Sequence, residues 1–306
     1  MQIEMQCDII CLKLKRCQIK REDIMEYSIL KNGVKIPMIG FGTWIAVKED
    51  SDIVLKAIEA GYRLIDTAAF YDNEEQIGES LQKSSVPREE LFLTSKVWKT
   101  NLGYDKTIRS FERSLKNLKT DYLDLFLIHW PKNHLDTQDW IQEDQDTWRA
   151  MEMLYKAGKI RAIGLSNFYP HHMIPLLENA EIKPMVNQIE FHPGFTQKYV
   201  TDYCKENDMI VEAWSPLGRA AVLSDEVICN LAEKYGRTPA QICLRFTYQC
   251  GIVSLPKASS KIRMHQNLEI FDFEISNEDM SVIYTLPQTG WSGEHPDRRP
   301  LVDLGW

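Results

Sequence analysis

The feature that most constrains this 306-residue chain is a repeated alternation of short apolar stretches with helix-like stretches. The apolar stretches are residues 38–42, 62–66, 91–96, 122–128, 160–165, 185–189, 209–213 and 252–255. Near-continuous apolar strands are typical of a parallel sheet that is covered on both faces. Because a helix-like stretch follows each of them, we predict an α/β fold, a (β/α)8 TIM barrel, over an open sheet.

A short hairpin precedes this alternation. Residues 27–30 and 34–37 have strand-like patterns, and Asn32-Gly33 between them is a favoured turn. We expect this N-terminal β-hairpin to close the bottom of the barrel.

Helix signals lie between the strands. We expect helices near residues 51–60, 73–81, 108–118, 145–156, 170–178, 196–205, 225–235 and 261–268. Asn73 and Thr238 stand at helix starts, with Gln76 and Gln241 three residues later. This spacing predicts a capping box at both helices.

The chain has no linker rich in Pro, Gly and Ser, so we predict a single domain over residues 25–306. Residues 1–24 have a different composition. Within them, residues 7–21 carry five basic residues against one acid and lack the apolar core of a signal peptide. The three cysteines of this segment match no common zinc spacing. We therefore expect a non-native or disordered extension, with Met25 as the natural start.

Composition argues against several classes of protein. The net charge of -8 leaves no dominant basic surface for nucleic acid. No apolar stretch approaches the ~20 residues that a membrane span needs. The seven cysteines are odd in number and widely spaced, which favours reduced thiols over a disulfide framework. We therefore expect a cytoplasmic protein, a monomer or weak dimer, that acts on a small molecule.

Polar side chains stand at or just after the ends of three consecutive apolar stretches. Asp66, Lys96 and His129 occupy these positions, and Tyr71 follows soon after Asp66. Taken singly, they are more often a turn former, an exposed lysine, a structural histidine and a half-buried aromatic. In a barrel, however, the carboxyl ends of the strands form one rim, where the active site lies. Their convergence on that rim predicts one catalytic site.

These four groups together suit carbonyl reduction. Hydride addition leaves negative charge on the carbonyl oxygen, so a proton donor must lie beside it. An ammonium ~4 Å from a phenol favours the tyrosinate by up to ~4 kcal/mol, or ~3 pKa units, at a dielectric constant near ~20. We therefore expect Lys96 to bring the pKa of Tyr71 toward neutral pH, with Asp66 holding the lysine and His129 orienting the carbonyl. No side chain carries a hydride, so a nicotinamide cofactor is required.

The cofactor must bind without a Rossmann fingerprint, because no G-x-G-x-x-G follows any strand. Two other stretches are candidate phosphate sites. The first is the turn Ser215, Pro216, Leu217, Gly218 and Arg219, and the second is the group Lys257, Ser259 and Arg263. Backbone amides of such a turn suit a pyrophosphate, and barrel enzymes commonly bind phosphate after the last strand. A basic group of this kind, taken alone, is more often a solvated helix start.

Tryptophans also lie just past strand ends, at positions 44, 98, 130 and 214. Rings at the rim predict an aromatic-walled pocket rather than core packing. The residues that we expect to line the substrate pocket are Trp44, Tyr71, Trp98, His129 and Trp130.

The motifs resemble those of the aldo-keto reductase superfamily. They are Gly40-Phe41-Gly42-Thr43-Trp44, Asp66-Thr67-Ala68 through Tyr71 to Asn73-Glu74, Ser95-Lys96-Val97-Trp98, Leu127-Ile128-His129-Trp130-Pro131, Gly164-Leu165-Ser166-Asn167-Phe168, Asn187-Gln188-Ile189-Glu190, Glu212-Ala213-Trp214-Ser215-Pro216-Leu217-Gly218, and Leu255-Pro256-Lys257 with Arg263 and Asn267. They occur in the family's order from about residue 27 to the end. The resemblance implies a barrel that reduces aldehydes or ketones with a nicotinamide cofactor.

The resemblance also implies roles for single residues. Tyr71 matches the proton donor, Lys96 the residue that lowers its pKa, Asp66 the carboxylate paired with that lysine, and His129 the substrate-orienting histidine. The matching cofactor positions are Thr43, Trp44, Asp66, Ser166, Asn167, Gln188, Trp214, Ser215, Pro216, Leu217, Gly218, Lys257, Ala258, Ser259, Arg263, Gln266 and Asn267.

The resemblance assigns these residues to different parts of the cofactor. Ser166, Asn167 and Gln188 match the residues that hold the nicotinamide carboxamide, and Trp214 matches the aromatic residue that stacks on the nicotinamide ring. Lys257, Ser259 and Arg263 match the residues that bind the adenosine 2′-phosphate. A clamp on that phosphate implies NADPH/NADP+ over NADH. Ala258 replaces a common Ser or Thr and Gln266 a frequent Glu, and both departures bear on cofactor preference.

The tail, residues 289–297, resembles the microbial branch that includes 2,5-diketo-D-gluconate and methylglyoxal reductases. It implies an open pocket for small carbonyls, dicarbonyls or keto-sugars. One alternative is a cofactor-binding regulatory subunit with negligible turnover. A metal hydrolase is disfavoured, because no H-E-x-x-H occurs and His171-His172 opens a helix, where adjacent side chains diverge. We therefore expect no metal site.

Overall fold

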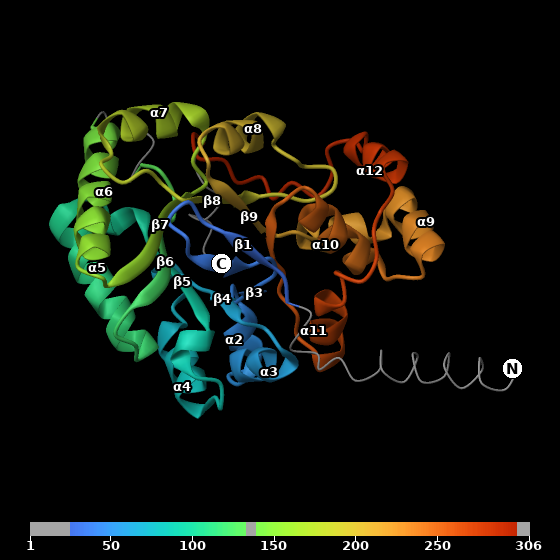
Figure 1. The fold of residues 1–306 in the computed structure, drawn as a ribbon, viewed down its shortest axis with the longest axis horizontal. Helices are drawn as coiled ribbons and strands as arrows, with labels where there is room; N and C mark the ends of the chain where they lie inside the picture. Colours follow the sequence, from blue (N-terminus) through green and yellow to red (C-terminus); the bar gives the residue numbers. More distant parts are fainter. Residues whose placement is uncertain (1–24, 133–138, 299–306) are drawn as a thin grey trace, which may run out of the picture.

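The computed structural model describes residues 25–132 and 139–298, which form a ring of parallel strands with helices around it (Figure 1). The barrel strands are β3 (Phe41–Gly42), β4 (Leu64–Asp66), β5 (Phe92–Val97), β6 (Leu123–Ile128), β7 (Ile160–Ser166), β8 (Val186–Glu190), β9 (Ile210–Trp214) and β10 (Val253–Leu255). Each strand pairs in parallel with the next one along the chain. The predicted (β/α)8 barrel is confirmed. The proposed extension, residues 1–24, lies outside the described residues.

The barrel closes between its first and last strands. Ile39, just ahead of β3, forms a parallel bridge to Ser254 of β10. The amide of Gly40 donates to the Ser254 carbonyl oxygen at 2.8 Å. A Cβ at Gly42 would lie only 2.9 Å from the Leu255 carbonyl oxygen, so a side chain here would force the two strands apart. The strand expected over residues 38–42 is regular only in its last two residues, because its first part bridges across this closure.

The hairpin consists of β1 (Tyr27–Ile29) and β2 (Lys35–Pro37), which pair antiparallel as predicted. Leu30 and Ile36 are buried in one apolar cluster with strand residues such as Leu127. Asn32 Nδ2 donates to the carbonyl oxygen of Arg161, near the start of β7, at 2.9 Å. The hairpin therefore covers the barrel at the amino ends of its strands.

Helices pack around the outside of the barrel (Figure 1). They are α2 (Ala46–Glu49), α3 (Ile53–Ala60), α4 (Glu74–Lys83), α5 (Tyr104–Leu118), α6 (Trp140–Lys156), α7 (Pro170–Asn179), α8 (Lys198–Glu206), α9 (Glu226–Tyr235), α10 (Pro239–Gln249), α11 (Lys261–Leu268) and α12 (Asn277–Tyr284). Their apolar faces cover outward strand residues; Phe111 of α5, for example, packs edge-on against Phe126 of β6. Within the described ranges, no helix has the length and apolar character to cross a membrane.

The two predicted capping boxes have different outcomes. Thr238 and Gln241 form theirs at the start of α10. Asn73 precedes α4 but makes no side-chain cap hydrogen bond, so that prediction is wrong. Its Nδ2 donates to the Thr43 carbonyl oxygen at 3.1 Å, and its Oδ1 accepts from the Thr67 hydroxyl at 2.7 Å. Asn73 thereby ties together the loops that follow β3 and β4.

Candidate active site

A buried ion pair lies at the carboxyl ends of β4 and β5. The Lys96 side chain is fully buried, and its Nζ donates to Asp66 Oδ1 at 2.7 Å and to the Thr67 carbonyl oxygen at 2.9 Å. Thr43 Oγ1 donates to the Asp66 carbonyl oxygen at 2.9 Å and fixes the same strand end. Burial opposes the charge of Lys96, but the Asp66 carboxylate and its other partners outweigh burial and raise the pKa of Lys96. The lysine is therefore a fixed positive charge at the rim.

Tyr71 faces this positive charge from the short turn η2 (Ala69–Tyr71), which follows β4. Its phenol oxygen lies 3.4 Å from Lys96 Nζ. Burial raises the pKa of Tyr71; Lys96 lowers it, Asp66 raises it further, and the net shift is upward. Lys96 acts on this phenol in the expected direction, but burial of the tyrosinate outweighs the attraction of the ammonium, so the pKa is not brought toward neutral pH in this structure. The phenol keeps its proton at neutral pH, which is the state that a proton donor requires.

His129 follows β6 and lies on another side of the phenol. The ring centroids of His129 and Tyr71 are 5.6 Å apart in an edge-to-face arrangement. Burial, and after it the charge of Lys96, holds the pKa of His129 well below its usual range. Its Nδ1 has no hydrogen-bond partner among the described residues. This neutral imidazole can donate one hydrogen bond without competing for the proton of Tyr71.

Aromatic rings form a wall beside these groups. Trp44 contacts Tyr71 with a centroid separation of 4.8 Å, and Trp98 contacts His129 at 5.0 Å. Phe70 stacks on Trp98 at 3.7 Å and lies parallel to Trp44 at 5.7 Å. Sequence reasoning missed Phe70, whose only signal was its place directly before Tyr71. The three rings form one continuous apolar wall at the rim.

A polar cluster lies at the ends of β7, β8 and β9. Ser166 Oγ donates to the Gln188 carbonyl oxygen at 2.9 Å. Asn167 Nδ2 donates to the carbonyl oxygen of His129 at 2.9 Å, and its Oδ1 accepts from Trp214 Nε1 at 2.8 Å. The structure therefore brings the predicted carboxamide-binding residues and Trp214 together. They lie next to Asp66, Tyr71, Lys96 and His129, which we call the tetrad.

The predicted pyrophosphate turn directly follows β9. The Gly218 amide donates to the Ser215 carbonyl oxygen at 2.8 Å, across Pro216 and Leu217. Ser215 has a φ of 48° and Arg219 a φ of 51°, which is the left-handed region. Residues other than glycine rarely adopt this backbone conformation unless contacts elsewhere in the fold hold them in it. The turn leads into η5 (Gly218–Ser224) at the same rim.

The predicted 2′-phosphate residues lie around the start of α11. Arg263 Nη2 donates to Ser259 Oγ at 2.5 Å, and the Ser260 side chain caps the helix by accepting from the Arg263 amide. The other predicted residues here are Ala258 and Asn267, which are buried, and Lys257 and Gln266, which are half-buried. An arginine at a helix amino terminus attracts anions through both its charge and the helix dipole.

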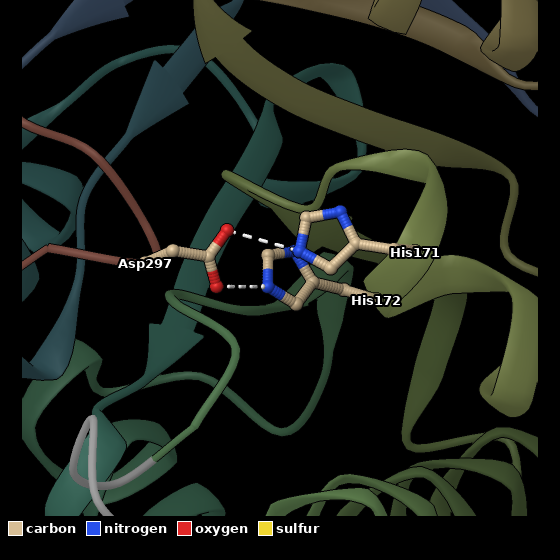
Figure 2. Close-up of side chains that lie close together, drawn as sticks. All are labelled: His171, His172 and Asp297. Atoms are coloured by element: carbon tan, nitrogen blue, oxygen red, sulfur yellow. Dashed lines mark hydrogen bonds and ion pairs between the residues drawn. The ribbon is translucent and has the colours of Figure 1, made fainter.

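The tail is anchored at the rim by Asp297. In Figure 2 its carboxylate faces both histidine rings, with one oxygen toward His171 and the other toward His172, at Nε2–O distances of 2.9 and 3.0 Å. Lys132, after β6, pairs with the same carboxylate at 2.5 Å. The expectation that the two adjacent histidines diverge is wrong, since their ring centroids lie 3.9 Å apart. They converge because each ring bonds to one oxygen of the same carboxylate.

These three side chains have metal-ligating groups, yet their hydrogen bonds account for the arrangement. The Tyr169 amide donates to His172 Nδ1 at 3.1 Å. The neutral ring must therefore carry its proton on Nε2 and donate it to Asp297. Burial lowers the pKa of His172 to about 4, so the ring stays neutral near pH 7. With Nε2 protonated and the Lys132 ammonium on the carboxylate, the group acts as an anchor for the tail.

Tail residues also line a cavity at the rim, which the sequence did not indicate. Its walls include Trp130, Asn167, Tyr169, Trp214, Glu294 and Pro296. The Glu294 carboxylate pairs with Arg219 of the pyrophosphate turn at 2.6 Å. The tail thus bridges the turn after β9 and the amino end of α7.

Comparison with known proteins places this geometry in a family. The model of the Aldo/keto reductase family matches residues 38–286. Glyoxal reductase of Bacillus subtilis (strain 168) is 50% identical over 270 residues, covering 88% of this chain and 95% of the relative. A solved aldo-keto reductase from a Medee basin deep-sea metagenome library is 42% identical, with a TM-score of 0.81 and coverage of 86% and 95%. The Bombyx mori aldo-keto reductase in complex with NADP is 34% identical, with a TM-score of 0.80 and coverage of 86% and 93%. The chain belongs to the aldo/keto reductase family.

Proposed function

We propose that the chain is an NADPH-dependent oxidoreductase that reduces small aldehydes and ketones to alcohols. Dicarbonyls and keto-sugars fall within the substrate class that we propose. The relative that is named glyoxal reductase, at 50% identity, supports a small dicarbonyl. The observation that carries the proposal is the position of Lys96 Nζ, 3.4 Å from the Tyr71 phenol and 2.7 Å from Asp66.

Tyr71 acts in this proposal as the general acid. Its phenol is protonated at neutral pH, because the ordinary pKa of tyrosine is ~10 and burial raises the pKa of Tyr71 further. As the carbonyl oxygen gains negative charge, the phenol gives it a proton, and the nearby Lys96 ammonium stabilises the tyrosinate that remains. Asp66 keeps the lysine in place, and neutral His129 donates a hydrogen bond that orients the carbonyl oxygen. Trp44, Trp98 and Trp130 complete the substrate pocket, together with Phe70.

The residues at the rim fit a nicotinamide cofactor, which supplies the hydride when bound. Hydroxyl and amide groups of Ser166, Asn167 and Gln188 suit the carboxamide, and the fixed indole of Trp214 offers a face for the ring. Arg263 and Ser259, in contact with each other at the start of α11, suit the 2′-phosphate together with Lys257. The remaining cofactor residues in the proposal are Thr43, Trp44, Asp66, Ser215, Pro216, Leu217, Gly218, Ala258, Gln266 and Asn267.

The cellular setting is part of the same proposal. The net charge of -8 and the cysteine pattern support a cytoplasmic protein that binds no nucleic acid. We take residues 25–306 as a single domain, a monomer or weak dimer, preceded by an extension over residues 1–24.

The proposal is tested by following NADPH absorbance with a panel of small aldehydes, dicarbonyls and keto-sugars, beside NADH. Turnover that favours NADPH is expected. Tight NADPH binding, measured by fluorescence quenching, without reduction of any panel member would contradict the enzyme and favour a regulatory subunit.

A further inference from the structure

Glu212 on β9 is a buried carboxyl that the mechanism above does not use. It is joined to the tetrad through one side chain, since Gln188 Nε2 donates to Glu212 Oε2 at 2.9 Å and to Asp66 Oδ2 at 2.8 Å. Asp66 in turn accepts from Lys96 at 2.7 Å. All four side chains are almost fully buried, so these contacts form one continuous path from Glu212 to the catalytic lysine.

The two hydrogen bonds determine which way the Gln188 amide faces. An amide nitrogen has two hydrogens, and here both go to carboxyl oxygens, one of Asp66 and one of Glu212. A flipped amide would place its carbonyl oxygen against the Asp66 carboxylate, which can only accept, and would take the N–H away from Glu212 Oε2. Together with Asp66, Glu212 therefore leaves the Gln188 carbonyl oxygen as the group that can accept an N–H from a nicotinamide carboxamide.

Glu212 is poorly suited to be an anion. Its second oxygen, Oε1, is buried and has no hydrogen-bond partner among the described residues. Gln188 on β8 and Val253 on β10 flank it in the sheet, and neither titrates. The charged groups that act on it are Asp66 and Lys96, and burial followed by Asp66 raises the pKa of Glu212 to about 8. The carboxyl is therefore mainly neutral near pH 7.

We propose that Glu212 is a positioning residue for carbonyl reduction, which orients Gln188 toward the cofactor and, when it ionises, weakens proton donation by Tyr71. This inference rests on the proposed function. While Glu212 is neutral, Lys96 and Asp66 form one balanced pair beside the phenol. When Glu212 loses its proton, its negative charge joins that of Asp66 at Lys96 and offsets more of the field that the ammonium exerts on Tyr71. Tyrosinate then forms less readily and reduction slows.

Two substitutions separate the two effects. Glu212→Gln keeps an oxygen that accepts from Gln188 but cannot ionise, whereas Glu212→Ala removes the acceptor. A matched control is Glu74→Gln, since Glu74 is also buried, accepts from Ser95 at 2.7 Å, and has a pKa that burial raises. Among the described residues, its carboxyl makes no hydrogen bond to Asp66, Tyr71, Lys96 or His129.

The test measures kcat/KM for carbonyl reduction from pH 6 to 10 and the NADPH dissociation constant by fluorescence quenching. For the wild-type protein and Glu74→Gln, we expect reduction to fall as the pH rises through about 8. For Glu212→Gln, the fall should move up by at least ~1 pH unit, with NADPH affinity within about twofold of wild type. For Glu212→Ala, NADPH affinity should drop by roughly 5- to 10-fold, the worth of one hydrogen bond.

The outcomes distinguish this inference from the proposed function. A wild-type protein that reduces no carbonyl would overturn both. Normal wild-type turnover, with Glu212→Gln following the wild-type pH profile, would overturn the role of Glu212 alone. If Glu212→Ala does not fold, Glu212→Gln decides the result by its pH profile.

Discussion

The ammonium nitrogen of Lys96 lies 3.4 Å from the phenol oxygen of Tyr71, although the two residues come from different strand-end segments. Lys96 is inside β5, where the parallel ladder to β4 and β6 fixes its position. Tyr71 is in the turn after β4, which Asn73 ties to the neighbouring loop. A rigid barrel thus sets the distance on which proton donation depends.

The first prediction concerns the stability that the buried Lys96–Asp66 ion pair gives the folded protein. Lys96→Met leaves the buried Asp66 carboxylate without its ammonium and should lower the free energy of unfolding by roughly 3–5 kcal/mol. The double variant Lys96→Met/Asp66→Asn should recover most of that loss. Urea denaturation measures both. The exposed pair of Lys198 and Asp202 gives the control, because Lys198→Met should cost less than about 1 kcal/mol. Equal losses for the buried and the exposed pair would contradict the structure.

The residues at the start of α11 predict a difference between two cofactors. Arg263→Ala or Lys257→Ala should weaken NADPH binding by at least ~10-fold and NADH binding much less, because only NADPH has the 2′-phosphate. Lys261→Ala is the control, since Lys261 lies on the same helix but pairs with Glu59. Dissociation constants for both cofactors check this. Equal losses for NADPH and NADH would mean that the phosphate lies elsewhere.

The buried histidine of the tail anchor predicts a dependence of stability on pH. Burial lowers the pKa of His172 from 6.5 to about 4 in the folded protein. As the pH falls from 6.5 toward 4, the unfolded chain takes up a proton that the folded protein refuses, so stability is lost over this window. The loss from His172 is at most about 3 kcal/mol. His129, whose pKa is also lowered by burial, adds to the same trend.

This trend is measured as the free energy of unfolding between pH 7 and 4, for the wild-type protein and His172→Asn. The variant cannot titrate at this position and should show a shallower decline. A decline as steep as that of the wild-type protein would remove His172 from the explanation.

We expect the loss of the Asp297 carboxylate to loosen the tail locally. Asp297→Ala removes the acceptor of His171, His172 and Lys132, so residues 292–298 should exchange their amide hydrogens faster. Hydrogen exchange followed by mass spectrometry detects this, with α5 as an internal reference that should not change. Unchanged exchange at the tail would show that other contacts hold it.

The barrel and its strand ends were predictable from the sequence, because apolar runs mark buried strands directly. Asp66, Lys96 and His129 were found for the same reason, since each interrupts or ends such a run. One helix that was missed also had a signal: Ser276, three residues before Asp279, caps the start of α12. Local patterns therefore carried most of the architecture.

What the sequence did not predict depends on contacts between distant residues. Asn73 has the local pattern of a cap, but its side chain bonds to Thr43 and Thr67, which are distant in the sequence or in another loop, instead of to its own helix. His171 and His172 converge only because Asp297 lies beside them. The direction of the pKa shift of Tyr71 depends on how deeply the phenol is buried, and burial is a property of the whole fold.

The most direct test of the mechanism compares the wild-type protein with Tyr71→Phe, using NADPH and glyoxal or another dicarbonyl that the wild-type protein reduces. Removing only the hydroxyl should lower kcat by at least ~10²-fold, the usual contribution of a positioned acid. The NADPH dissociation constant should stay within about twofold, because no hydrogen bond to the cofactor is lost. A variant that retains near-normal turnover would contradict the assignment of Tyr71 as the proton donor.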